Sequence, residues 1–330
     1  MRREILSVAL FIAVATSISI QMPAAQAQDY PTRTVRMLVG SAPGSTTDIV
    51  GRVVAEGLHT RLGQTFVVEN NSGANGMLAA ETVAKATPDG YTVLAGYASQ
   101  ICVNPHVYKT IKYDAEKNFT PITPVVAAPF VLIVNPNNPR TASVKSLQDL
   151  VALAKARPGT LTFGSAGIGS MVHLVSEQLN LALGLKTVHV PYRGSAPMET
   201  GMLAGETDYA FANLSAVPQV QAGRLRGLAV SGTSRWRDLP DVPATAELGL
   251  PSTLNMSSWF GILVTAGTPD KIVQLLNREI NALVLVPAAR ERLLKYGEIA
   301  TKSVPAFRAQ IRTEVQQYGD IVKRLNIKLE

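Results

Sequence analysis

The sequence predicts a two-lobed α/β protein. Short apolar runs alternate with amphipathic segments, which is the pattern of strands and helices arranged in layers. The pattern occurs twice, and two long extended stretches without helix signals, 119–139 and 252–269, lie where the chain passes between the two occurrences. We therefore expect two lobes, each a mostly parallel sheet flanked by helices, joined by two crossover segments.

The first 27 residues have the pattern of a secretory signal peptide. A charged start, MRRE, precedes an apolar stretch at 8–20 and the small-residue motif Ala25-Gln26-Ala27. The apolar stretch is too short to span about 30 Å of hydrocarbon. We expect cleavage after Ala27 and export to the periplasm without stable membrane insertion. The alternative is an uncleaved anchor.

The first lobe opens with a β-α-β-α-β unit, whose crossovers should be right-handed. The predicted strands are 34–40, 65–70 and 91–97, and the predicted helices are 47–63, ended by Gly63, and a helix within 72–87. Two C-terminal helices, at 271–285 and 305–325, complete this lobe. The expected boundaries are 28–127 plus 254–330 for the first lobe.

The second lobe, expected at 128–253, repeats the alternation. Its predicted elements are a helix at 143–159, a strand at 160–167, a helix at 170–184, a strand at 186–192, a helix at 196–206, a strand at 207–213, and then a helix followed by a strand at 225–232. A two-lobed protein with paired crossovers closes over a ligand by hinge motion. The ligand belongs in a cleft outside the carboxyl ends of the strands.

Three turns from strand to helix are rich in glycine and serine. The first, SAPGSTTD at 41–48, offers Ser45 as an N-cap and Asp48 near the positive end of the helix dipole. In the second lobe, 164–170 and 192–198 repeat the arrangement. One interpretation is helix capping alone. The other is that free N–H groups and hydroxyls bind an anion, and three such turns around one cleft indicate a carboxylate receptor.

Several classes of function find no support in the sequence. The net charge is +7, but the basic residues are scattered, so no nucleic-acid partner is expected. Cys102 is the single cysteine, which excludes an internal disulfide, and we expect it to be buried. His59, His106 and His189 show no metal-ligand spacing. The glycines of 164–169 fit neither a nucleophile elbow nor a dinucleotide motif, so we expect no catalytic residue, metal or cofactor.

A set of motifs, taken together with their order and spacing, carries a family resemblance. They include YPTRTVRMLV, VVENNSGANG, FGSAGIGS, HVPYRGSAP, LAGETDY and SWFGILVTAGTP. Over nearly its whole length after residue 27, the chain resembles the extracytoplasmic solute receptors of tripartite tricarboxylate transporters, the TctC or Bug family. The resemblance implies a type II periplasmic-binding-protein fold without enzymatic activity. It also implies delivery of a small di- or tricarboxylate or aromatic acid to the membrane subunits of a transporter, and we expect a monomer.

Two other functions stay open at this stage. The same cleft would serve a receptor that presents its ligand to a sensor kinase, and a periplasmic hydrolase or isomerase is the enzymatic alternative. These classes differ in what becomes of the ligand, because an enzyme consumes it whereas a receptor releases it unchanged.

The resemblance implies that main-chain amides, hydroxyls and bridging waters from both lobes hold one ligand carboxylate. The expected ligand-binding residues are Ser41, Gly44, Ser45, Thr46, Thr47, Asp48, Tyr97, Ser99, Ser165, Gly169, Ser170, His173, Arg193, Gly194, Ser195 and Asn213. For Arg193, the alternatives are pairing with a second ligand carboxylate and exposure to solvent. For His173, they are lining the cleft and packing or capping within the lobe.

Overall fold

The computed structural model describes residues 30–73 and 75–327, so the expected signal peptide at 1–27 lies outside the described residues. The chain from Arg33 onward forms one compact unit, and the fold described below is that of this unit. Within the described ranges no single helix is long and apolar enough to cross a membrane. Two consecutive helices, Asp270–Leu283 and Pro287–Leu294, reach that length and apolar composition only together, and they meet at an angle of 85°.

The described part of the first sheet has six strands in the order β11-β4-β10-β3-β1-β2. Their bounds are β1 Val35–Val39, β2 Phe66–Asn70, β3 Thr92–Tyr97, β4 Phe119–Pro129, β10 Ser257–Thr265 and β11 Glu298–Ile299. β1 pairs in parallel with β2 and β3. β10 runs antiparallel to β3 and β4, and β11 runs antiparallel to β4.

The second sheet has the order β7-β6-β8-β5-β9 in the described residues. Its strands are β5 Val131–Val134, β6 Thr162–Ser165, β7 Val188–Pro191, β8 Tyr209–Ala212 and β9 Arg226–Val230. β6 is parallel to β7 and β8, whereas β5 is antiparallel to β8 and β9.

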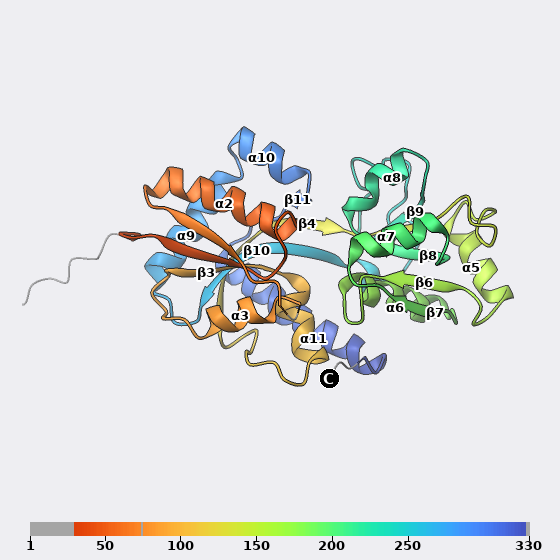
Figure 1. Cartoon of the computed structure of the whole chain (residues 1–330), viewed down its shortest axis with the longest axis horizontal. Helices are drawn as coiled ribbons and strands as arrows, with labels where there is room; N and C mark the ends of the chain where they lie inside the picture. The colour runs from red at the N-terminus through yellow and green to blue at the C-terminus, as the bar shows by residue number, and fades with distance from the viewer. Residues whose placement is uncertain (1–29, 74, 328–330) are drawn as a thin grey trace, which may run out of the picture. The chain divides into compact units, whose positions relative to one another are not determined.

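The predicted α/β architecture of two sheets joined by two crossovers is confirmed, with one correction. Both sheets are mixed and not mostly parallel, because the crossover segments are themselves strands that run back through the sheets. The first crossover supplies β4 and then, past Phe130, β5; the second supplies β10. Figure 1 shows β4 and β10 extending between the two groups of strands. The exact lobe boundaries stay a prediction.

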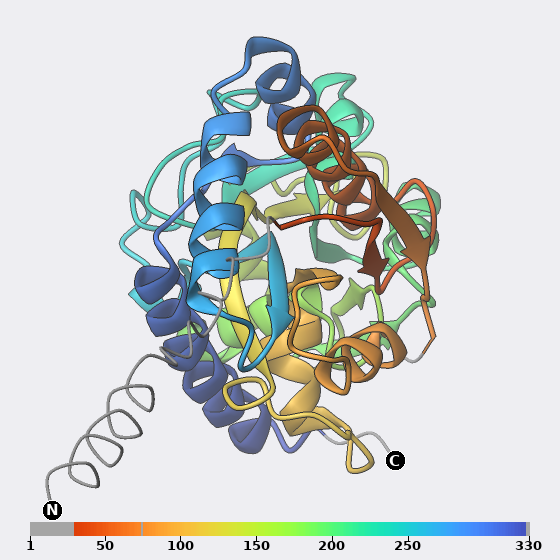
Figure 2. The ribbon, with the colours of Figure 1, turned by 90° about the vertical axis from the view of Figure 1, so that its left-hand side faces the viewer.

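The predicted helices are all present. Their bounds are α2 Thr46–Leu62, α3 Met77–Ala84, α5 Leu147–Ala156, α6 Met171–Leu183, α7 Ser195–Ala204, α8 Val217–Gln221, α9 Asp270–Leu283 and α11 Val304–Arg324. Gly63 ends α2 in the left-handed conformation, as predicted. α2 and α9 pack together on one face of the first sheet, and α3 and α11 cover the other face (Figure 2).

Short elements that were not predicted include the π-helix η1 Ser99–Val103, α4 Asn104–Val107, the 3₁₀ helix η3 Ser252–Leu254, α10 Pro287–Leu294 and β11. The residues of α10, PAARERLL, lack an apolar period, and Pro287 at its first turn is the main local sign of a helix. η1 is buried throughout, and its residues, SQICV, show no amphipathic period in the sequence.

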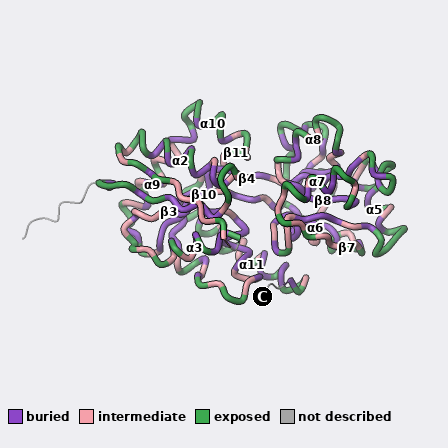
Figure 3. The backbone as a smooth tube through the Cα atoms, viewed as in Figure 1, coloured by how far each residue is buried: buried purple, intermediate pink, exposed green. Residues whose placement is uncertain are grey.

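The strands and the faces of the helices against them form the core (Figure 3). The aromatic side chains of Phe130, Phe211 and Trp259 are almost completely buried, so they belong to the core. Cys102 is buried, as predicted. Burial, together with the nearby Glu314, raises the pKa of its thiol well above the ordinary value, which keeps the thiol protonated.

Candidate functional site

The turn between β1 and α2 begins with a pair of serine hydroxyls. Ser45 is the N-cap of α2, in an extended conformation, and its Oγ accepts a hydrogen bond of 3.3 Å from the backbone N–H of Asp48. The Oγ atoms of Ser41 and Ser45 lie 2.6 Å apart. Gly44 is exposed with a φ of 80°, a conformation that favours glycine. The predicted capping role of Ser45 is therefore confirmed.

The carboxylate of Asp48 is buried inside this turn. It accepts hydrogen bonds from the N–H of Gly44 at 2.9 Å, Nδ2 of Asn70 at 2.9 Å and Nε of Arg52 at 3.1 Å. Burial raises the pKa of Asp48, but the hydrogen bonds from Arg52, Gly44 and Asn70 outweigh burial and lower the pKa below its ordinary value. With its oxygens occupied by these donors, Asp48 shapes the turn and offers an anion no donor of its own.

The first turn of α2 has N–H groups that remain available. The N–H groups of Thr46 and Thr47 make no hydrogen bond to any described residue outside their own helix, as expected for the first residues of a helix. Thr46 is half-buried and Thr47 is buried. These two N–H groups stand at the positive end of the helix dipole, where an anion is stabilised.

Tyr97, at the end of β3, is linked to the same turn. Its hydroxyl donates to the carbonyl of Asn75 at 2.9 Å and lies 3.5 Å from the carbonyl of Gly40, which directly precedes Ser41. Burial raises its pKa far above the ordinary value, so the hydroxyl stays protonated and remains a donor. Ser99, two residues later, is buried at the start of η1. The structure thus brings two of the predicted residues, Tyr97 and Ser41, to one end of the first sheet.

The glycine-rich turn between β6 and α6 is held by its own side chains. The Oγ of Ser165, which is fully buried, lies 2.7 Å from Nε2 of His189 and accepts the N–H of Gly167 at 3.1 Å. Ser170 caps α6, as predicted, because its Oγ accepts the N–H of His173 at 3.3 Å. Nδ1 of His173 in turn accepts the N–H of Gly169 at 3.1 Å.

His173 packs within the second lobe. It is 4% exposed, and its ring stacks on that of His189 with 4.0 Å between centroids. Burial and the neighbouring His189 lower the pKa of His173 to about 3, and burial lowers that of His189 to about 4. Both rings are therefore neutral near pH 7. Among the described residues no group of three or more His, Cys, Asp or Glu could hold a metal ion.

The histidine pair was missed from the sequence. The two residues lie on different elements, α6 and β7, and only the parallel pairing of β6 with β7 places them together beside Phe163. Sequence reasoning considered His189 by itself. No local spacing signal would have found the pair.

The turn between β7 and α7 contains an exposed cation. Arg193 is exposed and makes no hydrogen bond or ion pair with a residue in 30–73 or 75–327. Gly194, with a φ of 120°, stands at the N-cap of α7. Ser195 accepts a hydrogen bond of 2.8 Å at Oγ from Nδ2 of Asn213, which follows β8. The structure thus joins two more of the predicted residues, Ser195 and Asn213.

The β6–α6 turn of the second sheet contacts the first lobe. A Cβ atom at Gly169 would lie 3.1 Å from Cγ1 of Val107 in α4, which directly follows η1 and Ser99. The glycine-rich turn that follows β6 therefore lies against α4 of the first lobe. Gly169 also has a φ of 77°, so both its conformation and its surroundings favour glycine.

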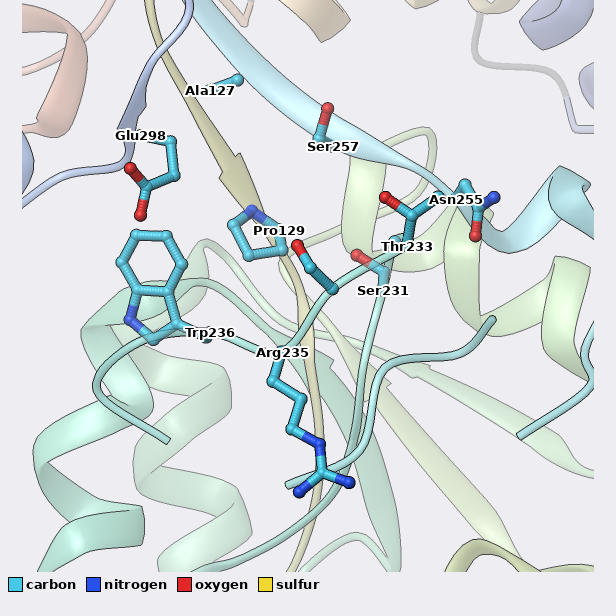
Figure 4. A pocket seen from close by; sticks show the side chains of 11 residues that line it. Ala127, Pro129, Ser231, Thr233, Arg235, Trp236, Asn255, Ser257 and Glu298 are labelled. Atoms are coloured by element: carbon cyan, nitrogen blue, oxygen red, sulfur yellow. The ribbon is translucent and has the colours of Figure 1, made fainter. Parts of the chain in front are cut away.

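Two cavities lie elsewhere in the molecule. One, of about 370 Å³, is lined by residues of β4, β10 and β11 and by the segment after β9 (Figure 4). The other, of about 430 Å³, lies beside α2 and β2. Neither is lined by an expected ligand-binding residue. The predicted turns lie outside both of these cavities.

Residues 50–327 match the sequence profile described as "Tripartite tricarboxylate transporter family receptor". The chain belongs to this family. Protein BugT of Bordetella pertussis is 34% identical over 333 residues, which cover 100% of this chain and 99% of BugT. The family assignment made from the motifs is therefore confirmed.

Two solved structures share the fold. The structure described as "R. palustris Rpa4515 with adipate" is 34% identical, with a TM-score of 0.79, and the match covers 91% of this chain and 100% of that chain. The periplasmic binding protein BugD is 30% identical with a TM-score of 0.76, over 91% of this chain and 100% of BugD. The two-lobed periplasmic-binding-protein fold is thus confirmed.

Proposed function

We propose that this receptor captures a small carboxylic acid between its two lobes and delivers it to the membrane subunits of a tripartite tricarboxylate transporter. The observation that supports the proposal is the contact of the glycine-rich β6–α6 turn with the first lobe, where Gly169 lies against Val107 of α4. Binding of adipate by a relative with the same fold supports a carboxylate as the ligand.

In this proposal the first ligand carboxylate accepts hydrogen bonds from the N–H groups of Thr46 and Thr47. The positive end of α2 adds favourable electrostatics without a buried basic side chain. Asp48 holds these donors in place through Gly44 and Asn70. Ser41 and Ser99 would contribute hydroxyls around the same carboxylate, and Tyr97, whose hydroxyl donates to the carbonyl of Asn75, would hold the neighbouring backbone in place.

Arg193 is the proposed partner of a second carboxylate. It is exposed, it has no protein partner among the described residues, and it directly precedes the N-terminus of α7. A guanidinium binds a carboxylate through two parallel hydrogen bonds, which makes the contact strong and directional. The second lobe would thus recognise the far end of a dicarboxylic acid.

The arrangement favours a receptor over an enzyme. Ser165 and His189, with 2.7 Å between Oγ and Nε2, resemble a nucleophile with its base. Ser165 is nevertheless fully buried, and its Oγ also contacts both the N–H and the carbonyl of Gly167. A substrate would have no access to this oxygen. The pair is better explained as a support for the turn that carries Gly169 and Ser170.

We further propose that the protein works as a monomer in the periplasm after cleavage behind Ala27. The family includes a periplasmic binding protein of known structure, and the N-terminal sequence has the features of a signal peptide. N-terminal sequencing of the protein recovered from a periplasmic extract tests the cleavage position, and light scattering on the same material tests the monomeric state.

Thermal unfolding of the purified mature protein tests the proposed function. Adipate, shorter and longer dicarboxylates, citrate and benzoate are added in turn, and the bound acid is recovered and identified by mass spectrometry. A ligand at 100 times its dissociation constant stabilises the folded state by about 2.7 kcal/mol. We expect at least one acid to raise the melting temperature and to be recovered unchanged. A chemically altered acid, or no shift with any acid, would contradict the proposal.

A further inference from the structure

Arg237 connects the second lobe to the first. Its Nη1 lies 3.4 Å from Oε1 of Glu298 in β11, and its Nη2 donates a hydrogen bond to the carbonyl of Leu294 at the end of α10. The guanidinium also lies over the ring of Trp236, 4.8 Å from the centroid. The segment that carries Arg237 belongs with the second sheet, because Val230 of β9 pairs with Ala244 beyond it.

The contact lies on the opposite side of the crossover strands from the proposed binding site. In the first sheet, β11 is the neighbour of β4 on one side, while β3 and β1 lie beyond β10 on the other. In the second sheet, β9 lies on one side of β5, and β8, β6 and β7 lie on the other. The predicted ligand turns follow β1, β3, β6, β7 and β8. Glu298 and Arg237 belong to the opposite edges, on β11 and after β9.

The contact borders the cavity of about 370 Å³. Pro129 and Ser257, from the two crossover strands, form one part of its lining, and Trp236 and Glu298 form another. Figure 4 shows the carboxylate of Glu298 directed toward the ring of Trp236. The cavity therefore lies beside the contact, with Trp236 of the second lobe and Glu298 of the first lobe both on its wall.

We propose that the contact of Arg237 with Glu298 and Leu294 opposes closure of the lobes and so lowers the affinity of the ligand site. This inference rests on the proposed function. When two lobes rotate about the strands that join them, groups on one side approach and groups on the other side separate. Closure over a ligand therefore lengthens or breaks the Arg237 contact. The apparent affinity falls in proportion to the fraction of closed molecules before binding.

Arg237 and Glu298 are thus positioning residues, which set the balance between open and closed forms without touching the ligand. Loss of an exposed ion pair has a modest effect, so we expect Arg237→Ala to lower the dissociation constant for adipate about fivefold, which corresponds to about 1 kcal/mol. If Arg237 had a purely structural role, Arg237→Ala would lower the stability of the protein and leave the affinity for adipate unchanged or weaker.

The matched control is Arg235→Ala. Arg235 is an arginine two positions away, and its partners Glu247 and the carbonyl of Pro240 belong to its own segment. Its replacement removes the same charge without removing a contact between the lobes. Glu298→Gln serves as a second test variant, because it removes the ion pair from the first lobe and keeps the shape of the side chain.

The experiment measures the lobe separation directly. Spin labels are attached at Thr60→Cys in α2 and Thr200→Cys in α7, and the distance distribution is recorded by double electron–electron resonance; the natural Cys102 is buried and should not react. Without ligand, Arg237→Ala and Glu298→Gln should both move the distribution toward that of the closed form, whereas Arg235→Ala should not. Isothermal titration with adipate then measures the affinity.

An unchanged distribution in both Arg237→Ala and Glu298→Gln would overturn the inference, as would an equal change in Arg235→Ala. The distances are measured without ligand, so they decide the inference even when adipate does not bind. Failure of every acid in the binding assay would instead contradict the proposed function.

Discussion

Nδ1 of His173 accepts a hydrogen bond of 3.1 Å from the backbone N–H of Gly169. The bond requires an unprotonated Nδ1, and burial supplies this state by lowering the pKa of His173 to about 3. The histidine therefore does not need to face the ligand to affect the site. It fixes the turn that brings the second lobe against α4.

Replacing His173 should destabilise the protein by about 1–3 kcal/mol, because His173→Leu leaves the buried N–H of Gly169 without an acceptor. Urea denaturation followed by circular dichroism measures the change in the free energy of unfolding. The control is Glu177→Gln, since 3.8 Å separates Glu177 from Nε2 of His173 and no hydrogen bond joins them. Equal losses in the two variants would contradict the role of the Gly169 bond.

The histidine pair also predicts a pH dependence of stability. The folded-state pKa values of about 3 for His173 and about 4 for His189 lie below the unfolded value of about 6.5. The unfolded chain therefore binds more protons between pH 6.5 and about 4, and stability falls as the pH is lowered through this range. Burial raises the pKa of Glu177, which opposes the trend.

The double variant His173→Gln, His189→Gln isolates the contribution of the two histidines, because Glu177 remains in it. We expect the midpoint of urea denaturation to decline less steeply between pH 6.5 and 4 in the double variant than in the wild type. Parallel pH profiles for the two proteins would show that the histidines do not supply the dependence.

Asp48→Asn should weaken both the fold and the proposed ligand site. The substitution removes the charge that pairs with Arg52 and places an amide donor beside Nδ2 of Asn70. We expect a loss of about 1–3 kcal/mol in the free energy of unfolding, since a buried charged acceptor is lost. The pair of Arg36 and Glu69 is an exposed control, and Glu69→Gln should cost about 0–1 kcal/mol.

The lowered pKa of Asp48 determines where this contribution disappears. A carboxyl group whose folded pKa lies below its unfolded value stabilises the protein above the unfolded pKa, and the stabilisation is lost as the pH falls through the folded pKa. The difference in stability between wild type and Asp48→Asn should thus be largest near neutral pH and shrink in acid below about pH 4. A constant difference would contradict the charge-based explanation.

Arg193→Ala should distinguish dicarboxylates from monocarboxylates. If the guanidinium binds a second carboxylate, adipate should lose about 1–3 kcal/mol of binding free energy, and hexanoate, with the same chain length and one carboxylate, should lose little. Isothermal titration measures both. Arg224→Ala removes another exposed arginine and should affect neither acid. Equal losses for adipate and hexanoate in Arg193→Ala would reject the pairing.

Local features of this protein were predictable from the sequence. Ser45 and Ser170 were identified as helix starts because a serine N-cap bonds to backbone only three residues away. Strand and helix positions were predictable from apolar periodicity, because this pattern also depends only on residues close together in the sequence. Motif order was sufficient to identify the family, and with it the two-lobed fold.

Features that depend on tertiary contacts were not predictable. The bond from Asn70 to Asp48 joins residues 22 positions apart, and the partners Arg237 and Glu298 are separated by 61 positions. The antiparallel parts of the sheets depend on which strands pair with the crossover strands. No periodic pattern in the sequence specifies these pairings, because they result from the packing of whole elements.

Backbone N–H groups at the start of α2 are the proposed donors to the ligand carboxylate. The decisive experiment records amide chemical shifts of deuterated, ¹⁵N-labelled protein during titration with the acid that most raises the melting temperature. We expect saturable downfield shifts of the amide protons of Thr46 and Thr47. Unchanged shifts at both residues, with changes confined to Ser257 and Asn255 around the cavity behind the crossover strands, would contradict the proposal.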